Sequence, residues 1–525
     1  MASIEIKTNE QGNPTGVIFT KEFCPELWAT MLNLTDDERF YGSQPVEYEL
    51  AKLFQYRDQL NDALSAGNVS VAELAFLIAD QFKDNIEQFE NMSGDGKITF
   101  QHLGSLFKVG TRFVATTGGK LVGSVVHATN IEQDMFGGRY FNVTGIFTKT
   151  SGKDYFQEER VFSVQEFGGL KKIQDLNVRP MADDEFKMLT ERGRTYVKYG
   201  LGPNFVAYKG NMFKQGMYGP VYFKADGRIM IDHVGYYSNN PNSRQGNRRA
   251  TCNSEIPEDL LYMAWPFMYG FCFVAKQWGE LYIDCVSEIK FDDNAFDILV
   301  IPGEIKKLTK ALVVHSSGTF TDIITGKSGG CIFLLKGTPG IGKTLTCEAI
   351  AELLHRPLYS VTVGELGTTV EMLERKLHQI LEIAASWNAI ILIDEADIFL
   401  EKRTDNDIQR NAMVGIFLRL LEMHQGVMFL TTNRANSLDD AFKSRISLII
   451  PYNDFDVSTR VAVWNTLLKA SNTELLPEEV LMLGEFNING RQIKNAIRMA
   501  QSLAKSEDAI VSVDHLKHVI SFMNL

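Results

Sequence analysis

Hydrophobic residues change their spacing along the chain of 525 residues. Up to about residue 95, apolar side chains recur at three- and four-residue intervals, as in segments 46–64 and 70–89, which predicts amphipathic helices. From 96 to 310, short aromatic and β-branched runs are separated by glycine turns, a pattern typical of strands. We therefore predict a helical N-terminal region over 1–95 and a strand-rich α+β domain over 96–310.

The remaining sequence has a third pattern, in which apolar strands alternate with amphipathic helices. This alternation predicts a parallel sheet with helices on its faces over 311–451. The last stretch, 452–525, has only helical spacing. We predict that it forms a small helical lid appended to the sheet.

One segment of the C-terminal part combines a strand, a glycine-rich turn and a helix. The apolar strand that starts at Cys331 is followed by Gly337-x4-Gly342-Lys343-Thr344 and an amphipathic helix. Glycines at this spacing let backbone N–H groups converge on phosphate oxygens at a helix N-terminus. Lys343 adds a charge for the β- and γ-phosphates, and Thr344 offers a hydroxyl to Mg²⁺. The predicted nucleotide-binding residues are Gly337, Thr338, Pro339, Gly340, Ile341, Gly342, Lys343, Thr344 and Leu345.

Two later strands end in side chains that suit the same site. One apolar strand ends in Asp394 and Glu395, which point to opposite sides because they are adjacent in an extended segment. Asp394 would orient Mg²⁺, and Glu395 would polarise the attacking water as a general base. Another strand ends in Asn433, which would hold the water or the γ-phosphate. The alternative for Asn433 is a simple turn residue at a strand end.

Two arginines complete the candidates. Arg445 follows Asn433 by twelve residues and suits contact with the transferring phosphoryl group of a neighbouring subunit. Arg491 starts a helix of the lid, from which it would reach phosphates bound to its own chain. Taken singly, either arginine is more often a surface salt-bridge residue.

These five elements, in this order, resemble the AAA+ ATPases, and more narrowly the AAA group, over about 311–525. Further segments, among them ILIDEADIFLEKR, INGRQIKNAIR and FGGLKKIQDLNVRPM, are similar to a largely uncharacterised AAA family abundant in fungi. That family carries its own N-terminal domain, so the resemblance covers roughly 100–525. The fold class that it implies is an α/β P-loop NTPase module with a C-terminal helical lid, preceded by the two N-terminal regions.

The resemblance also implies roles for single residues and for the assembly. Lys343 and Thr344 would be Walker A, Asp394 and Glu395 Walker B, Asn433 sensor 1, Arg445 the arginine finger and Arg491 sensor 2. Asp322 and Ile323 would lie near the adenine of ATP. AAA proteins usually work as homo-oligomeric rings, often hexamers, with ATP at subunit interfaces.

Two features depart from the usual AAA pattern. Many members carry two arginines in an RPGR run, whereas this sequence reads SRI with Arg445 alone. Members that thread a substrate usually place an aromatic residue in the loop after the second strand, and the segment 363–370 has none. The second departure argues against axial threading of a polypeptide.

Composition narrows the class of partner. The 65 acidic against 53 basic residues give a net charge of −12 and a pI near 5.4, which disfavours a general nucleic-acid binder. A polar loop contains Arg244, Arg248 and Arg249, and it is either a solvated loop or a contact for an acidic partner or nucleic acid. The six cysteines form no CxxC pair, and no signal peptide or membrane-spanning run is evident, so we predict a soluble intracellular protein, cytoplasmic or nuclear.

Three functions remain. The favoured one is an ATP-hydrolysing ring that remodels or disassembles a protein partner. The alternatives are a nucleotide-gated assembly ATPase without threading and a nucleic-acid motor or loader.

Overall fold

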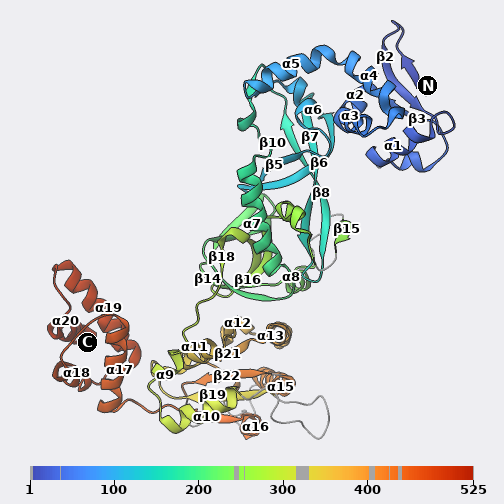
Figure 1. Cartoon of the computed structure of the whole chain (residues 1–525). Coiled ribbons are helices and arrows are strands. Elements are labelled where there is room, and N and C mark those ends of the chain that lie inside the picture. The colour runs from blue at the N-terminus through green and yellow to red at the C-terminus, as the bar shows by residue number, and fades with distance from the viewer. Residues whose placement is uncertain are drawn as a thin grey trace. The chain divides into compact units, whose positions relative to one another are not determined.

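The computed structural model describes residues 4–35, 37–241, 248–252, 255–314, 330–400, 408–424, 426–434 and 440–523. The chain forms two compact units, Met1–Ser287 and Glu288–Leu525 (Figure 1). Helix α10 (Gly303–Val314) runs through the predicted boundary between residues 310 and 311. The finer division into four domains stays a prediction.

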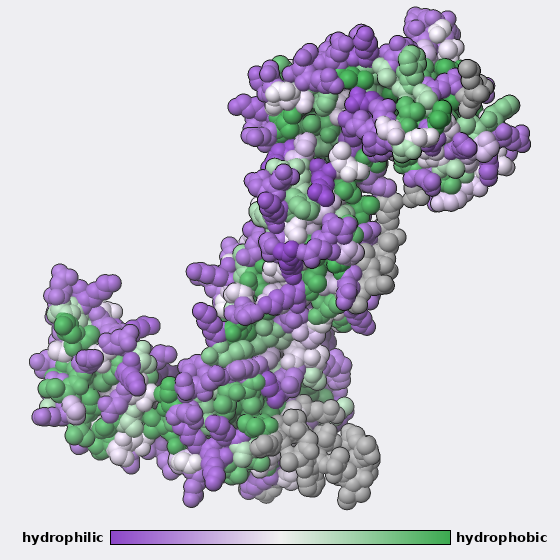
Figure 2. Space-filling view, viewed as in Figure 1, coloured by the Kyte–Doolittle hydropathy of each residue, from purple (hydrophilic) through white to green (hydrophobic). Residues whose placement is uncertain are grey.

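The N-terminal region of the first unit combines helices with a small antiparallel sheet. The strands are β1 (Glu5–Thr8), β2 (Pro14–Phe19) and β3 (Val46–Glu49), paired in that order. The helices are α1 (Pro25–Thr35), α2 (Leu50–Leu53), α3 (Arg57–Ser65), α4 (Ala72–Gln81) and α5 (Lys83–Gly94). Helix α5 has no fully buried residue, and Figure 2 shows mostly hydrophilic side chains over it.

One predicted helix begins later than its spacing indicated. Residues 46–49, which we assigned to a helix, form strand β3. Their alternating pattern buries Val46 and Tyr48 and exposes the two glutamates between and after them, as a strand with one covered face requires. The alternation of buried and exposed side chains in these four residues therefore decides their structure, although the residues that follow have helical spacing.

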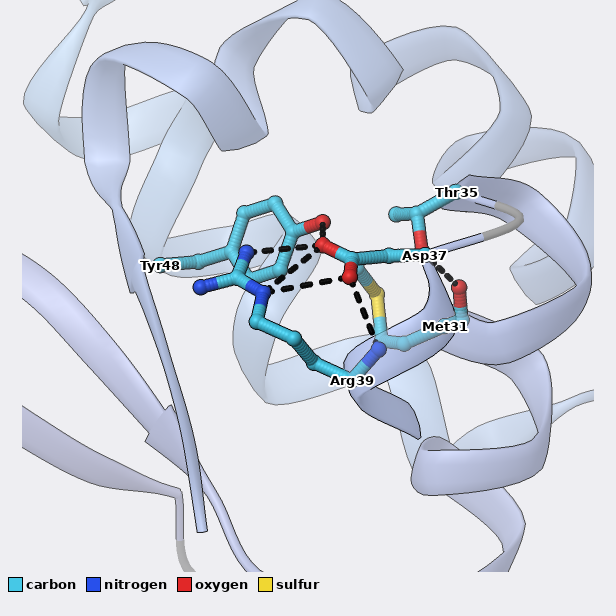
Figure 3. A network of polar contacts seen from close by, with 5 residues as sticks. All are labelled: Met31, Thr35, Asp37, Arg39 and Tyr48. Atoms are coloured by element: carbon cyan, nitrogen blue, oxygen red, sulfur yellow. Dashed lines mark hydrogen bonds and ion pairs between the residues drawn. The ribbon is translucent and has the colours of Figure 1, made fainter. Parts of the chain in front are cut away.

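A polar network joins β3 to the turn after α1 (Figure 3). The Tyr48 hydroxyl donates to Asp37 Oδ2 at 2.5 Å, and Arg39 Nη2 donates to the same oxygen at 2.7 Å. The hydrogen bond from the Arg39 guanidinium holds the pKa of Asp37 well below its usual range. These contacts lie among helices and strands of the N-terminal region, so we interpret them as structural.

The rest of the first unit is strand-rich, as predicted. Its described residues form a six-stranded antiparallel sheet in the order β10-β5-β6-β7-β8-β15 and a seven-stranded one in the order β13-β12-β17-β16-β14-β11-β18. The first comprises β5 (Arg112–Thr117), β6 (Lys120–Gln133), β7 (Arg139–Thr150), β8 (Tyr155–Gln165), β10 (Val178–Pro180) and β15 (Arg248–Cys252). The second comprises β11 (Asn204–Tyr208), β12 (Asn211–Gly216), β13 (Gly219–Lys224), β14 (Gly227–Ile231), β16 (Phe267–Cys272), β17 (Gln277–Tyr282) and β18 (Val286–Ser287).

Helices connect these strands, and one of them starts with a buried histidine. They are α6 (Leu103–Leu106), α7 (Asp183–Gly200) and α8 (His233–Asn239). His233 is 2% exposed, and neither ring nitrogen has a hydrogen-bond partner among the described residues. Burial lowers the pKa of His233 to about 3, so its ring is neutral in the folded protein.

The second unit contains the predicted parallel sheet. Its described residues form five strands in the order β20-β21-β22-β19-β23, and every neighbouring pair is parallel. The strands are β19 (Cys331–Lys336), β20 (Leu358–Thr362), β21 (Ile390–Asp394), β22 (Val427–Thr432) and β23 (Leu448–Pro451). The helices are α9 (Ala295–Ile298), α10, α11 (Lys343–Leu353), α12 (Val363–Leu366), α13 (Val370–Trp387), α14 (Asp397–Leu400), α15 (Ile408–Met423) and α16 (Asp440–Lys443).

A helical lid follows the sheet, also as predicted. It consists of α17 (Val457–Ala470), α18 (Pro477–Gly484), α19 (Gly490–Ser506) and α20 (Val513–Met523). These helices share one apolar core that includes Trp464, Ile493 and Leu516. Across the described parts of both units, no helix combines the length and the apolar character that a membrane crossing needs.

Candidate nucleotide-binding site

The predicted site residues gather where the strands of the parallel sheet end. Lys336, the last residue of β19, pairs with Thr432 of β22, and Thr362 of β20 pairs with Asp394 of β21. Because the carboxyl ends of parallel strands meet at one edge, this edge is the usual place for ligands in such sheets. The turn after β19, the end of β21 and Asn433 therefore lie together.

The turn between β19 and α11 surrounds the amino group of Lys343. Lys343 Nζ donates to Gly337 O at 2.7 Å and to Thr338 O at 2.8 Å. It also donates to Asn433 Oδ1 at 2.9 Å. Burial lowers the pKa of Lys343, while the nearby Asp394 and other carboxylates act in the opposite direction. The structure thus brings Lys343 and Asn433, 90 residues apart in sequence, into direct contact.

Glycine is required at two points of this turn for different reasons. Gly342, which precedes α11, has a φ of 101°, although a Cβ there would meet only open space, so its backbone conformation selects glycine. Gly340 has a φ of 81°, and a Cβ there would lie 2.8 Å from the side chain of Asn489 in the lid. The lid therefore lies so close to the turn at Gly340 that a residue with a Cβ would not fit there without a shift.

Asp394 links the turn to β22. Thr344 Oγ1 donates to Asp394 Oδ2 at 3.4 Å, and Thr431 Oγ1 donates to Asp394 Oδ1 at 2.5 Å. A hydroxyl and a carboxylate are the oxygen ligands that Mg²⁺ prefers. Thr344 and Asp394 therefore fit a magnesium ion.

Glu395, next to Asp394, has an unusual backbone conformation. Its φ is 56°, in the left-handed region that residues with a side chain rarely adopt. Its N–H donates to Thr431 Oγ1 at 2.9 Å. Close to this contact, the Thr432 hydroxyl donates to Asp397 Oδ1, and the same oxygen accepts a bond from the Asn433 N–H at 3.1 Å.

Sequence reasoning missed Thr431, Thr432 and Asp397. Their signal in the sequence was weak: two threonines directly before Asn433, and a third carboxylate three residues after Asp394. Their contacts depend on which residues of β21 and β22 lie side by side, and local spacing does not specify that register.

Arg445 lies away from this edge. Its guanidinium contacts Glu422 and donates to Ala441 O at 2.7 Å. Two residues further on, Ser447 N donates to Ile332 O at 2.8 Å, which places this segment at the start of β19. The structure therefore does not bring Arg445 to the Lys343 turn of its own chain.

The start of α19 contacts the turn through one backbone donor and one side-chain donor. Arg491 N donates to Gly340 O at 3.2 Å, and Asn489 Nδ2 donates to Pro339 O at 3.4 Å. The side chain of Arg491 is exposed. A further bond joins Thr338 Oγ1 to Asp454 Oδ1 at 2.6 Å, just before the lid.

The remaining predicted residues fall into three groups. Ile341 is buried at 5% exposure and Leu345 is 53% exposed. Asp322, Ile323 and Arg244 lie outside the described residues. Of Arg248 and Arg249, the structure describes only the backbone in β15.

Comparison with known families places two matches on the chain. Residues 333–453 match the model described as ATPase family associated with various cellular activities (AAA). Residues 88–185 match a domain of unknown function (DUF7025). The resemblance to AAA ATPases is thereby confirmed, and an N-terminal domain of unknown function is present, as the resemblance implied. The AAA domain is that of a nucleotide-binding, ATP-hydrolysing enzyme.

Curated relatives are similar to about a third of the chain. The ATP-dependent zinc metalloprotease YME1 homolog of Caenorhabditis elegans is 30% identical over 188 residues, which are 34% of this chain and 26% of the relative. Spastin of Ixodes scapularis is 29% identical over 163 residues, which are 29% of this chain and 24% of the relative. The mitochondrial Lon protease homolog of Yarrowia lipolytica is 27% identical over 196 residues, which are 33% of this chain and 16% of the relative. The matched part thus spans about a quarter or less of these relatives.

Proposed function

We propose that this chain uses its AAA domain to hydrolyse ATP as a subunit of a homo-oligomeric ring that remodels or disassembles a protein partner. The meeting of Lys343, Asp394 and Asn433 at one sheet edge carries the proposal. Two of the relatives are named as proteases, which supports a protein as the partner.

Hydrolysis would use the residues at this edge in separate roles. The N–H groups at the start of α11 and the Lys343 ammonium would bind the β- and γ-phosphates. Asn433, already bonded to Lys343, would orient the attacking water, and Glu395 would accept its proton. Thr344 and Asp394 would hold Mg²⁺, which neutralises charge on the phosphate oxygens. Arg491, at the start of α19, would contact phosphates from the lid side.

The position of Arg445 supports the proposal of a ring. Because this arginine lies at the opposite end of β19 from the turn, it would contact a nucleotide only on a neighbouring copy of the chain. Such head-to-tail contacts close into a ring when the rotation between neighbouring copies closes, and a closed hexamer is our proposal for this chain.

One observation favours the alternative of a nucleotide-gated assembly without threading. The loop after β20 is a short capped helix, α12, in which Thr362 N donates to Glu365 Oε2 at 2.8 Å. Lys376 Nζ donates to Glu365 O at 2.6 Å, and Leu366 is fully buried. The loop therefore offers neither an aromatic nor an exposed large apolar side chain to grip a polypeptide. A nucleic-acid motor ranks third because the chain is acidic.

Substitutions at the site test the ATPase proposal. We expect Glu395→Gln to bind a fluorescent ATP analogue like the unaltered protein but to lose about 100-fold or more in turnover, since a general base supplies that much. Lys343→Ala should lose nucleotide binding. Glu382→Gln changes an exposed glutamate on α13 and serves as the control. Unchanged phosphate release in Glu395→Gln would reject the assignment of the site.

The partner is tested with the same variant. Glu395→Gln, held with ATP, is used to capture proteins, and each captured protein is purified and mixed with the active ring. Dissociation or unfolding of that protein only during ATP turnover supports remodelling. Retention that differs between ATP and ADP without such a change supports gated assembly, and turnover stimulated by single- or double-stranded DNA or RNA supports the third function.

A further inference from the structure

Thr431 contacts three successive residues where β21 ends, the last residue of the strand and the first two of the turn that follows it. Its Oγ1 donates to Asp394 Oδ1 at 2.5 Å and accepts from Glu395 N at 2.9 Å. Its carbonyl oxygen accepts from Ala396 N at 2.9 Å. Thr431 belongs to β22, the strand that leads to Asn433, the proposed water-orienting residue. Its side chain therefore connects this strand to Glu395, the proposed base.

The direction of both hydroxyl bonds is determined by their partners. A backbone N–H only donates, so the hydroxyl oxygen must accept from Glu395. Its single proton is then directed to the carboxylate of Asp394. Thr431 is 1% exposed, so water does not replace either bond without local opening.

The bond to Glu395 has a specific physical consequence. A φ of 56° is strained for a residue with a Cβ, and such conformations persist where surrounding contacts hold them. The bond from Glu395 N to the buried hydroxyl is such a contact. Without this bond, Glu395 would relax toward the ordinary extended or helical region of φ and ψ. Its carboxylate would then point in a different direction relative to Asn433.

We propose that Thr431 is a positioning residue that holds Glu395 in its left-handed conformation and fixes the direction of the base during ATP hydrolysis. This role rests on the proposed function of the site. Thr431 touches neither nucleotide nor water in it; it acts through Glu395 and Asp394.

The test separates the hydroxyl from the shape of the side chain. Thr431→Val keeps the branched shape and removes both hydroxyl bonds, whereas Thr431→Ser keeps the hydroxyl. The control is Thr309→Val: Thr309 in α10 is fully buried, and its hydroxyl has no partner among the described residues. Thermal melting is measured first, and Thr431→Ala carries the same expectation where Thr431→Val does not fold.

We expect Thr431→Val to lower kcat about tenfold or more, which is less than the roughly 10²–10³ lost when a donor to the reacting group itself is removed, because Thr431 acts through Glu395. KM for ATP and the affinity for a fluorescent ADP analogue should stay within about twofold, because Thr431 contacts no proposed phosphate-binding group and Asp394 keeps its bond from Thr344. Thr431→Ser should keep at least about half of the turnover, and Thr309→Val should match the unaltered protein. In nucleotide-free protein, the amide of Glu395 should exchange hydrogen faster in Thr431→Val than in Thr431→Ser.

Several results would overturn this role. They are full turnover in a folded variant that lacks the hydroxyl, equal loss of turnover in Thr431→Ser, and unchanged exchange at Glu395. Full turnover in Glu395→Gln would instead reject the proposed function together with the inference. Loss in Glu395→Gln beside full turnover in Thr431→Val would reject the role of Thr431 alone.

Discussion

The position of Arg445 makes a quantitative prediction about mixed rings. Ser447 is bonded to Ile332 near the start of β19, and the turn that holds Lys343 follows Lys336 at the other end. With a rise of about 3.3 Å per residue, the four steps from Ile332 to Lys336 separate these ends by about 13 Å. Arg445→Ala therefore removes no contact from the pocket of its own chain.

The expected size of the effect follows from the chemistry and from counting interfaces. An arginine that stabilises a transferring phosphoryl group is worth about 10³ or more in kcat, so Arg445→Ala alone should be nearly inactive. In an equal mixture with Lys343→Ala, a competent site needs an intact turn from one variant and an intact arginine from its neighbour. Each condition holds for half of the subunits, so about a quarter of the interfaces become competent, whatever the ring size.

The assay is steady-state phosphate release from the separate variants and from the mixture, at a concentration where light scattering shows rings. Recovery to about a quarter of the unaltered turnover per subunit is the expected result. Arg419→Ala, which removes an exposed arginine paired with Glu374, is the control and should change turnover by less than about twofold. No recovery on mixing, or full activity of monomeric Arg445→Ala, would refute action on a neighbouring subunit.

Two further predictions concern stability and the lid. His233 is neutral in the folded first unit, with a pKa of about 3 against 6.5 for the free side chain. Because the unfolded chain gains this proton below pH 6.5, the free energy of unfolding should decrease as the pH is lowered below 6.5, by up to about 1.4 kcal/mol per pH unit. His233→Phe should show a smaller fall between pH 7 and 5 in urea unfolding, and an identical pH dependence would contradict the assignment. Gly340→Ala should weaken nucleotide binding about tenfold or more and speed hydrogen exchange at the start of α19, because its methyl group meets Asn489 at a strained φ. Unchanged affinity, measured by fluorescence titration, would show that this approach of the lid is not needed for binding.

The sequence was most informative where function depends on neighbours along the chain. The glycine turn, Lys343 and Thr344 form one continuous segment, so their arrangement followed from spacing alone. Asp394 and Asn433 were found because each ends an apolar strand, and parallel strands end at the same edge. In each case the prediction used a local pattern together with one general rule of sheet structure.

Contacts that depend on register or on competing patterns could not be predicted in this way. Thr431 reaches Asp394 and Glu395 only because β21 and β22 are aligned as they are. Residues 46–49 have both helical and strand spacing, and pairing with β2 selects the strand. The pairing of Arg445 with Glu422 joins residues 23 positions apart, a separation that no local motif specifies.

The hydrogen bonds between the start of α19 and the glycine turn have a mechanical consequence. Helix α19 has 17 residues, so at 1.5 Å per residue it is about 25 Å long. Its first turn is hydrogen-bonded to Pro339 and Gly340, while no bond joins its far end to that turn among the described residues. A rotation of about ten degrees around the fastened end would sweep the far end through about 4 Å. In the proposed ring, a small adjustment of the turn on phosphate release would thus become a larger displacement at the far end of α19, which could alter its contacts with an adjoining copy of the chain.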